Sequence, residues 1–397
     1  MSLTNGSLIV VLWVAAIALL ALLVVRPRAI GPGWLRLLRR AGYQLAVTFT
    51  VLLAVAVTLN DQYGWYANWA DVGTMFSGTD PGDVVAAGAA AAQAASTPSG
   101  TGGTGDQQPV VPLTDLPGLR SLGLSAGAGP ATGQIREYTV TGPISRVSST
   151  VTVWYPPQYT EPAMAHHRFP VIEAFHGAPG TPRQLWYNMS LGKLVAQATH
   201  EGRIAPSIIV MPYYTPRALD TECVDGGAGQ PQVEQWLTRD VTSWVDHHLR
   251  VADDRGSWAT FGLSAGAWCA NMLAMLHPDQ FSAGISLGGY YQPQFEPGYT
   301  PFAPGSPQWH HYDLLGLARE HPPKVALWVQ TSAADPLSYS TTRQFLAVAR
   351  PPTSVTADVL RNAGHRLSVW VALIPQTLQW LGSTAPGFAP VSVKPTS

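Results

Sequence analysis

Residues 257–277 read Ser-Trp-Ala-Thr-Phe-Gly-Leu-Ser-Ala-Gly-Ala-Trp-Cys-Ala-Asn-Met-Leu-Ala-Met-Leu-His. The apolar run Trp258–Leu263 predicts a buried strand, and the stretch that begins at Ala265 has the spacing of a helix. Between them, the pattern Gly-x-Ser-x-Gly places Ser264 on a tight strand-to-helix turn. The two glycines let the strand and the helix approach each other. Ser264 is therefore the candidate nucleophile, at the carboxyl end of a strand and the N-terminus of a helix.

The chain contains a second copy of this pattern, which serves as a control. Residues 123–127 also read Gly-Leu-Ser-Ala-Gly. No apolar strand precedes this copy and no apolar helix follows it, so we interpret it as linker and Ser125 as unreactive. The five-residue pattern alone is thus a weak signal, and the strand–helix context around Ser264 carries the prediction.

Composition excludes several classes of protein. Charged residues make up only 12% of the 397 residues, and the formal net charge is −1. Such a chain lacks the basic field that favours nucleic-acid binding. Three pairs of adjacent histidines occur, but neighbouring side chains point apart on strands and helices, so we expect no metal site. We also expect no cofactor.

Two apolar stretches near the N-terminus predict two transmembrane helices. Leu8–Val25 holds 18 apolar residues without a charge, and residues 41–60 form a second stretch of similar reach. The loop 26–40 carries five arginines and no acidic residue, which places it in the cytoplasm by the positive-inside rule. A cleaved signal peptide is the alternative, but residues 1–7 lack the basic residues that such a peptide carries.

The chain is expected to have three parts. A multi-pass membrane anchor occupies residues 1–79, and a flexible linker rich in Ala, Gly, Ser, Thr and Pro occupies residues 80–133. A domain of residues 134–397 follows, on the extracytoplasmic side of the cell membrane. The oligomeric state is not predictable from the sequence.

The third part reads as an α/β domain. Strand-like and helix-like stretches alternate, which favours a mostly parallel sheet covered by helices on both faces. The predicted strands are 138–140, 149–155, 170–175, 207–212, 258–263, 283–287, 324–331 and 354–360, and the predicted helices are 184–200, 233–249, 265–277, 341–349 and 367–381.

A serine hydroxyl needs a base to remove its proton and an acid to orient that base. In this architecture the chain order is serine, acid, histidine. Asp335 follows the strand 324–331, and His365 follows the strand 354–360, where ligands gather in such sheets. We therefore predict a triad of Ser264, Asp335 and His365, with Asp358 and Asp313 as the alternative acids.

The tetrahedral intermediate of acyl transfer needs two N–H donors for its oxyanion. One is predicted to be the backbone N–H of Ala265, directly after the serine. The other is predicted in the loop Phe175–Gly180, with Ala178 favoured and Gly177 next. His176 precedes the serine in the chain and is expected to shape this loop rather than act as the base.

Cys223 and Cys269 are the two cysteines of the chain. Both lie in the part expected outside the cell, where a disulfide persists, and Cys269 follows Ser264 by five residues. We predict that they are joined, with two separate buried thiols as the alternative. Asp220, Glu222 and Asp225 stand on the same loop as Cys223, and they either line the substrate pocket or belong to a solvated loop.

The motifs Phe175-His176-Gly177, Gly262–Gly266, Asp335 and Gly364-His365 resemble the esterase D / antigen 85 family of α/β-hydrolases over about Gln134–Leu381. The resemblance implies the α/β-hydrolase fold and the site roles assigned above. Mycolyltransferases of that family carry an acidic residue in the loop after His-Gly, whereas residues 178–183 have none. The acid of their triad is usually a glutamate, whereas an aspartate, Asp335, is predicted here. The resemblance therefore implies a broader esterase or acyltransferase, similar to membrane-anchored esterases of actinobacteria.

Together these features predict a membrane-anchored, extracytoplasmic serine esterase or acyltransferase. Its substrate would be a soluble ester or an acyl ester of the envelope, including a lipid or glycolipid. Two other functions remain open from the sequence, a non-catalytic envelope-binding protein on a hydrolase fold and a serine peptidase. The choice between hydrolysis and acyl transfer, and the acyl chain and alcohol of the substrate, are not predicted.

Overall fold

The computed structural model describes residues 6–25, 33–63, 66, 72, 113–114, 133–216 and 219–390. The chain divides into two compact units. One comprises Met1–Thr79 and Asn362–Arg366, and the other comprises Asp80–Arg361 and Leu367–Ser397. The second Gly-Leu-Ser-Ala-Gly copy at 123–127 and nearly all of the predicted linker 80–133 lie outside the described residues, as do residues 26–32 of the predicted cytoplasmic loop.

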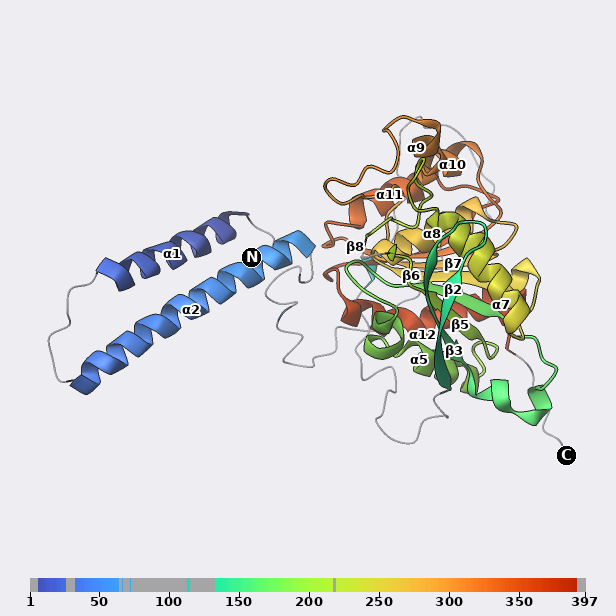
Figure 1. The fold of residues 1–397 in the computed structure, drawn as a ribbon, viewed down its shortest axis with the longest axis horizontal. Coiled ribbons are helices and arrows are strands. Elements are labelled where there is room, and N and C mark those ends of the chain that lie inside the picture. The colour runs from blue at the N-terminus through green and yellow to red at the C-terminus, as the bar shows by residue number, and fades with distance from the viewer. Residues whose placement is uncertain are drawn as a thin grey trace, which may run out of the picture. The chain divides into compact units, whose positions relative to one another are not determined.

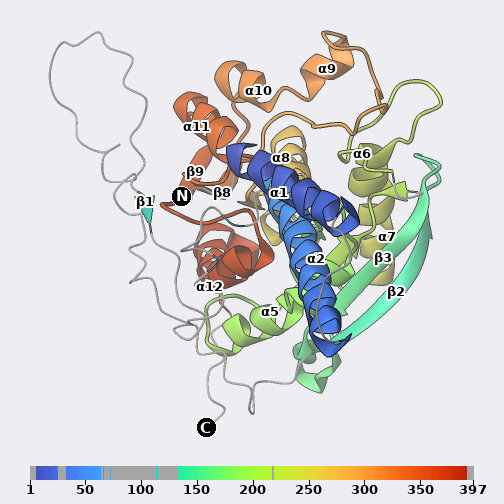
Figure 2. The ribbon, with the colours of Figure 1, turned by 90° about the vertical axis from the view of Figure 1, so that its left-hand side faces the viewer.

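The first unit contains two helices that lie side by side, α1 (Gly6–Val25) and α2 (Gly33–Tyr63) (Figures 1 and 2). The indole Nε1 of Trp13 in α1 donates a hydrogen bond to Thr58 Oγ1 in α2 at 3.2 Å. Helix α2 begins at Gly33, so residues 33–40 are helical and the connection is shorter than the predicted loop 26–40. Past Gly33 no further proline interrupts the sequence until well beyond this helix, so it can start there.

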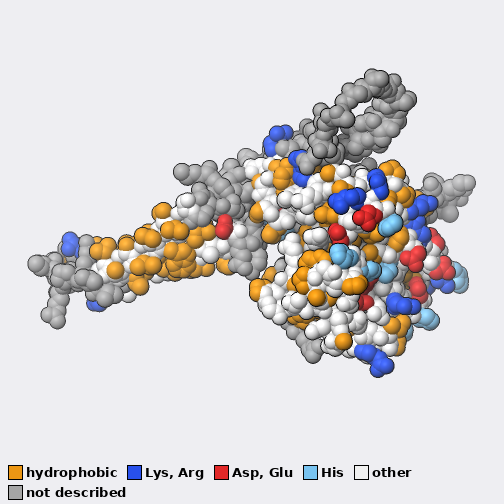
Figure 3. Space-filling view, turned by 90° about the horizontal axis from the view of Figure 1, so that it is seen from above, with side chains coloured by type: hydrophobic (Ala, Val, Ile, Leu, Met, Phe, Trp, Pro, Cys, Tyr) orange, Lys and Arg blue, Asp and Glu red, His pale blue; other side chains and the backbone are white. Residues whose placement is uncertain are grey.

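Apolar side chains cover the outside of these two helices. Ile17, Leu45 and Phe49 each expose more than half of their surface, and Figure 3 shows hydrophobic side chains along the pair. Among the described residues, one stretch, Leu37–Asp61, is long and apolar enough to cross a membrane by length and composition. The apolar part of α1 found by the same criterion, Ser7–Leu22, is shorter.

The second unit is built on a sheet whose described strands have the order β1-β9-β8-β7-β6-β4-β5-β3-β2. Strands β4 to β9 run parallel, and β1 pairs parallel with β9. At the other end of the strand order, β3 pairs antiparallel with both β5 and β2. The bounds are β1 (Leu113–Thr114), β2 (Gln134–Thr141), β3 (Ser148–Tyr155), β4 (Val171–Phe175), β5 (Ile208–Pro212), β6 (Trp258–Leu263), β7 (Ala283–Leu287), β8 (Ala326–Ser332) and β9 (Ser354–Leu360).

Helices cover both faces of this sheet (Figure 1). On β8, Leu327 belongs to the core beneath the helices of one face. The next residue, Trp328, faces the other side, where its ring centroid lies 5.9 Å from that of Trp380 in α12. The first face carries α6 (Val233–Gln235), η5 (Trp236–Val241), α7 (Thr242–His248), α8 (Ala265–Leu276) and α11 (Tyr339–Val348), and the second carries α5 (Leu191–His200) and α12 (Leu367–Thr384). The predicted α/β class is confirmed, and the sheet is mixed because β3 runs antiparallel to its neighbours β2 and β5.

Two features differ from the sequence prediction. The predicted helix 184–200 is broken into a short π-helix, η3 (Gln184–Asn188), and α5, because Ser190 adopts a left-handed backbone with φ 55°. The segment between β7 and β8 contains two short helices that were not predicted, α9 (Pro307–His311) and α10 (Leu314–Glu320). Each has only five to seven residues, too few for a clear helical period in the sequence.

Strand register aligns the carboxyl ends of the parallel strands. Leu263, the last residue of β6, pairs with Leu287 of β7, which pairs with Gln330 of β8. Ser332 at the end of β8 pairs with Leu360 at the end of β9. Segments that leave these strands therefore start from one edge of the sheet, the edge at which ligands bind in such folds.

Candidate active site

Close packing dictates the residues around Ser264. A Cβ atom added to Gly262 would lie 1.9 Å from the carbonyl oxygen of Gly266, and one added to Gly266 would lie 2.3 Å from the carbonyl oxygens of Phe175 and His176. Real Cβ atoms do not tolerate such contacts with backbone. The glycines therefore serve the close approach of β6, α8 and β4 that the sequence pattern predicts.

Ser264 itself has an unusual backbone. Its φ of 56° and ψ of −123° are unfavourable for a residue with a side chain. The turn is held because Ser264 N–H donates to Leu287 O at 2.9 Å, and Ser264 O accepts from Ala267 N–H at 2.9 Å. The side chain is partly exposed. Ala265 is the first residue of α8, so its N–H has no acceptor within the helix and is available to an anion.

The loop after β4 lies directly against the serine. A Cβ built on Gly177 would be 3.3 Å from Ser264 Cβ. Gly177 N–H donates to the side-chain Oε1 of Gln184 at 2.8 Å, and Tyr214 Oη donates to His176 O at 2.6 Å. Because the N–H of Gly177 is engaged, Ala178 is the better candidate of the two predicted loop donors.

His176 is part of the framework of this loop. The side chain is fully buried, and its ring stacks on that of Tyr214 with centroids 4.4 Å apart. Its Nδ1 is 2.9 Å from Gly177 O, and burial lowers the pKa of His176 to about 4. The imidazole is therefore neutral near pH 7 and bonds its own loop, as the sequence predicts.

Asp335 lies three residues beyond β8 and is almost fully buried. Its Oδ1 accepts the N–H of Leu337 at 2.9 Å, and its Oδ2 accepts the hydroxyl of Ser338 at 2.5 Å. The hydroxyl of Ser338 also bonds with that of Thr331 at 2.7 Å. This network fixes the carboxylate at the carboxyl edge of the sheet.

Both alternative acids have structural partners instead. Asp358 lies within β9 and accepts a hydrogen bond at 3.2 Å from Gln376 Nε2 of α12. Asp313 is the N-cap of α10 and accepts the N–H of Gly316 at 3.1 Å. Asp335 is the candidate of the three that follows the end of a strand, whereas Asp358 lies inside one and Asp313 caps a helix.

His365 stands between β9 and α12, five residues after the strand and two before the helix. Its side chain is 6% exposed. The segment that carries it, Asn362–Arg366, belongs to the first unit, whereas Ser264 and Asp335 belong to the second. The pairing of His365 with Ser264 and Asp335 is accordingly part of the proposal below.

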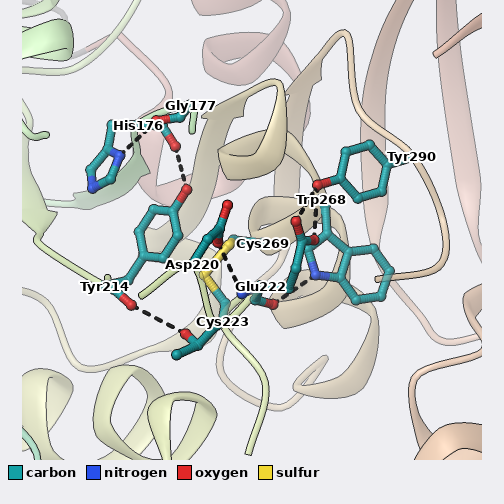
Figure 4. Close-up of a disulfide and its surroundings, with 10 residues drawn as sticks. His176, Gly177, Tyr214, Asp220, Glu222, Cys223, Trp268, Cys269 and Tyr290 are labelled. Carbon is teal, nitrogen blue, oxygen red and sulfur yellow. Dashed lines mark hydrogen bonds between the residues drawn. A yellow bond between two sulfur atoms is a disulfide. The ribbon is translucent and has the colours of Figure 1, made fainter. Parts of the chain in front are cut away.

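The predicted disulfide is present. Cys223 and Cys269 are bonded, with their Cα atoms 5.7 Å apart, and both residues are fully buried. The bond joins the loop after β5 to the second turn of α8 (Figure 4). Glu222 and Cys223 both have positive φ angles, 54° and 57°, so this stretch of loop has an unfavourable backbone that its contacts hold in place.

The acidic residues of this loop are bonded within the protein rather than solvated. Glu222 is 2% exposed; its carboxylate accepts the hydroxyl of Tyr290 at 2.6 Å, and its carbonyl accepts Trp268 Nε1 at 2.7 Å (Figure 4). Asp225 accepts the backbone and side-chain N–H groups of Gln235. Burial raises the pKa of Asp220 and, together with the charge of Asp220, that of Glu222. The predicted alternative of a fully solvated loop is therefore wrong for Glu222, which is buried and bonded within the protein.

The sequence did not point to several of these groups. Gln184, Tyr214 and Ser338 each place a polar atom on the candidate oxyanion loop or the candidate acid. None stands in a motif. The one sequence signal that could have identified them is their place in the chain, because Tyr214 closely follows β5 and Ser338 follows Asp335 by three residues.

Comparison with known proteins places the second unit in a family. A family model described as "Putative esterase" matches residues 146–381, more than half of the chain. An uncharacterized protein of Corynebacterium glutamicum is 30% identical over 144 residues, which are 35% of this chain. That match spans about a third, 32%, of the length of the relative.

Solved structures share the fold at low sequence identity. An S-formylglutathione hydrolase from Agrobacterium tumefaciens has a TM-score of 0.55 at 16% identity, covering 66% of this chain and 99% of its own. A ferulic acid esterase has a TM-score of 0.52 at 17% identity, covering 63% and 97%. A fluorophosphonate-binding serine hydrolase F from Staphylococcus aureus has 0.51 at 15%, covering 64% and 99%. These likenesses establish a hydrolase-like fold.

Proposed function

The chain belongs to the esterase family that matches it over residues 146–381, and from this premise we propose that it is a serine esterase or acyltransferase with Ser264, Asp335 and His365 as its triad. Family membership supports an ester substrate. The observation that carries the assignment is the strained backbone of Ser264 between β6 and α8, packed against the loop after β4. An unfavourable backbone at the strand-to-helix turn of a Gly-x-Ser-x-Gly pattern is typical of a nucleophilic serine, and this context supports the proposed role of Ser264.

The proposed reaction follows the order of acyl transfer. Ser264 Oγ attacks the ester carbonyl carbon while His365 takes its proton, and Asp335 holds the imidazole in the required tautomer. The N–H groups of Ala178 and Ala265 bind the oxyanion of the tetrahedral intermediate. His365 then protonates the departing alcohol, which leaves an acyl group on Ser264. Water or a second hydroxyl attacks this acyl-enzyme in turn and regenerates the serine.

Active-site labelling tests the assignment. A fluorophosphonate probe should label the full-length protein, and peptide mapping should place the adduct on Ser264. The variant Ser264→Ala should lose both the label and the hydrolysis of short p-nitrophenyl esters. Absence of labelling in a folded wild-type sample would overturn the enzyme assignment and favour the non-catalytic, envelope-binding alternative. Turnover of peptide anilides in place of esters would favour the peptidase.

A competition experiment separates hydrolysis from acyl transfer. The enzyme would be supplied with lipid and glycolipid acyl donors, with and without a sugar acceptor, and the products analysed by mass spectrometry. A transferase gives an acylated acceptor and little free acid, whereas a hydrolase gives free acid in both cases.

The proposal also places the catalytic domain outside the cell. Helices 8–25 and 41–60 would both span the membrane, with the basic residues between them inside and residues 134–397 held outside by the linker 80–133. Helix Leu37–Asp61 and the exposed apolar side chains of α1 support this arrangement. The two-span topology makes the protein multi-pass, with its substrate at or near the outer surface of the membrane.

Topology is testable with an impermeant maleimide on whole cells. Asn5→Cys and Thr101→Cys should react, and Gly33→Cys should react only after permeabilisation. Reaction of Gly33→Cys in intact cells would reverse the orientation and place the active site in the cytoplasm.

A further inference from the structure

The loop between His176 and Gly180 is fixed by hydrogen bonds on both sides of one peptide unit. On its N–H side, Gly177 N–H donates to Gln184 Oε1 at 2.8 Å. On its carbonyl side, His176 O accepts the hydroxyl of Tyr214 at 2.6 Å. The atoms at both ends of the His176–Gly177 peptide bond are therefore bound by side chains from outside the loop.

Gln184 occupies the inside of the turn that follows. A Cβ added to Gly180 would lie 3.0 Å from Gln184 Oε1 and 2.4 Å from Gly177 O. The loop 177–180 is thus folded back on itself around the amide oxygen of Gln184. Gln184 is the first residue of the short helix η3, which the left-handed Ser190 separates from α5, so an irregular segment and not a long helix carries this side chain.

Tyr214 connects the same loop to the disulfide. Its carbonyl accepts the hydroxyl of Thr221 at 3.3 Å, and the Thr221 loop is tied to α8 by the bond between Cys223 and Cys269 (Figure 4). Tyr214 is fully buried. Tyr214 therefore bonds both the loop after β4 and the loop that the disulfide joins to α8.

We propose that Gln184 is a positioning residue for catalysis, which occupies the N–H of Gly177 and so directs the next N–H, that of Ala178, to the oxyanion. Tyr214 holds the carbonyl side of the same peptide. This role rests on the proposed function, since it requires an oxyanion beside Ser264. It follows from geometry: Gly177 is against Ser264, its own N–H is engaged, and a displacement of about 1 Å in such a site can lower the rate by 100-fold.

The test removes the acceptor while keeping the shape of the side chain. Gln184→Met in the full-length protein should lower kcat for a p-nitrophenyl ester by about 10- to 100-fold, less than the roughly 100- to 1,000-fold for outright loss of one oxyanion donor, because Ala178 N–H is displaced and not removed. KM should stay within about twofold, and the fluorophosphonate labelling rate should fall in parallel with kcat. Gly180→Ala, which displaces the same turn, should have an effect at least as large. Tyr214→Phe should act in the same direction.

Matched controls come from the same residue types elsewhere. Gln197→Met removes a glutamine that bonds Glu201 on the surface of α5. Tyr155→Phe removes a hydroxyl that bonds Tyr138 at the end of β3. This end of β3 lies beside the amino ends of the parallel strands, whereas Ser264 follows the carboxyl end of β6. Neither control should change kcat.

The outcomes separate a positioning role from a structural one. If Gln184 only stabilised the fold, Gln184→Met would lower the melting temperature and the fraction of protein that labels, and kcat per labelled serine would equal that of the wild type. That result would overturn the proposal. Failure of the proposed function is distinct, because it would appear as a wild type without turnover or label at Ser264.

Discussion

Two regions of the catalytic edge hold their candidate residues by different means. On the serine side, β4, β6 and α8 approach so closely that Gly262 and Gly266 leave no space for a methyl group. On the acid side, Asp335 stands on a turn after β8 and is held by hydrogen bonds from Leu337 and Ser338. Steric exclusion fixes the first region, and directional polar contacts fix the second.

This difference predicts which substitutions each region can tolerate. A crowded backbone cannot relax around an added atom, so a side chain added at Gly262 or Gly266 should impair fold and activity together. A hydrogen bond contributes a few kcal/mol at most, so substitutions on the acid side should leave the fold in place and reduce activity by degrees.

Gly266→Ala should be the most damaging single change. The new Cβ would meet the carbonyl oxygens of Phe175 and His176 at 2.3 Å, and both belong to backbone, so β4 and the loop after it must move away from α8. We expect destabilisation of more than about 3 kcal/mol and loss of fluorophosphonate labelling, measured by urea unfolding and gel fluorescence. Gly42→Ala is the control, since a Cβ there meets nothing within 4 Å. A Gly266→Ala protein with normal activity would contradict the steric account.

The disulfide is the next test of the serine side. Cys223→Ala with Cys269→Ala opens a link across a sequence separation of 46 residues, for which the chain-entropy model gives about 4 kcal/mol. Unfolding in urea should shift to lower denaturant concentration by that free energy. The wild type treated with a reductant should shift by a similar amount, while the variant should not respond to the reductant. Two free thiols in protein taken from cells, detected by non-reducing mass spectrometry, would contradict the bond.

Much of this contrast could be predicted from the sequence, and the parts that could not be predicted have physical causes. The serine side is visible because steric exclusion demands glycine at fixed spacing from Ser264, and because the strands have clear apolar runs. The acid side is less visible, since a hydrogen bond from Ser338 can be supplied by many residue types at many positions. The burial of Glu222 also escaped prediction, because it depends on Tyr290, a residue 68 positions away in the chain.

Glu173 offers a pH-dependent test within the serine side. It lies in β4, is fully buried, and has no hydrogen-bond partner for either carboxyl oxygen in the described part of the chain. Burial raises the pKa of Glu173 well above its ordinary value of 4.5. In the folded protein the carboxyl group therefore stays protonated at pH values where it ionises in the unfolded chain.

The sign of the effect follows from that shift. Stability contributed by the protonated group is fully present below the unfolded pKa and is lost as pH rises through the folded pKa. Between these values the unfolding free energy should fall by about 1.4 kcal/mol per pH unit. Glu173→Leu and Glu173→Gln should both remove this slope, and unfolding at pH 5, 6 and 7 would measure it. If the slope in either variant equals that of the wild type, Glu173 is not its source.

The smallest expected effect is on the acid side. Ser338→Ala removes the hydroxyl that bonds Asp335 Oδ2 and Thr331 Oγ1. We expect a loss of about 1.5–3 kcal/mol in unfolding free energy, the usual range for a hydrogen bond to a charged group. The backbone bond from Leu337 N–H remains, so the carboxylate keeps part of its orientation.

Activity should follow the same reasoning. In Ser338→Ala, kcat/KM should fall by only about three- to tenfold, which corresponds to roughly 0.6–1.4 kcal/mol, and fluorophosphonate should still label Ser264. Ser383→Ala, which removes an exposed hydroxyl bonded to Trp380 O, should change neither quantity. A Ser338→Ala protein as damaged as Gly266→Ala would mean that the acid side is as rigid as the serine side, and the contrast between the two regions would fail. An unchanged kcat/KM would instead show that the Leu337 N–H alone suffices to orient Asp335.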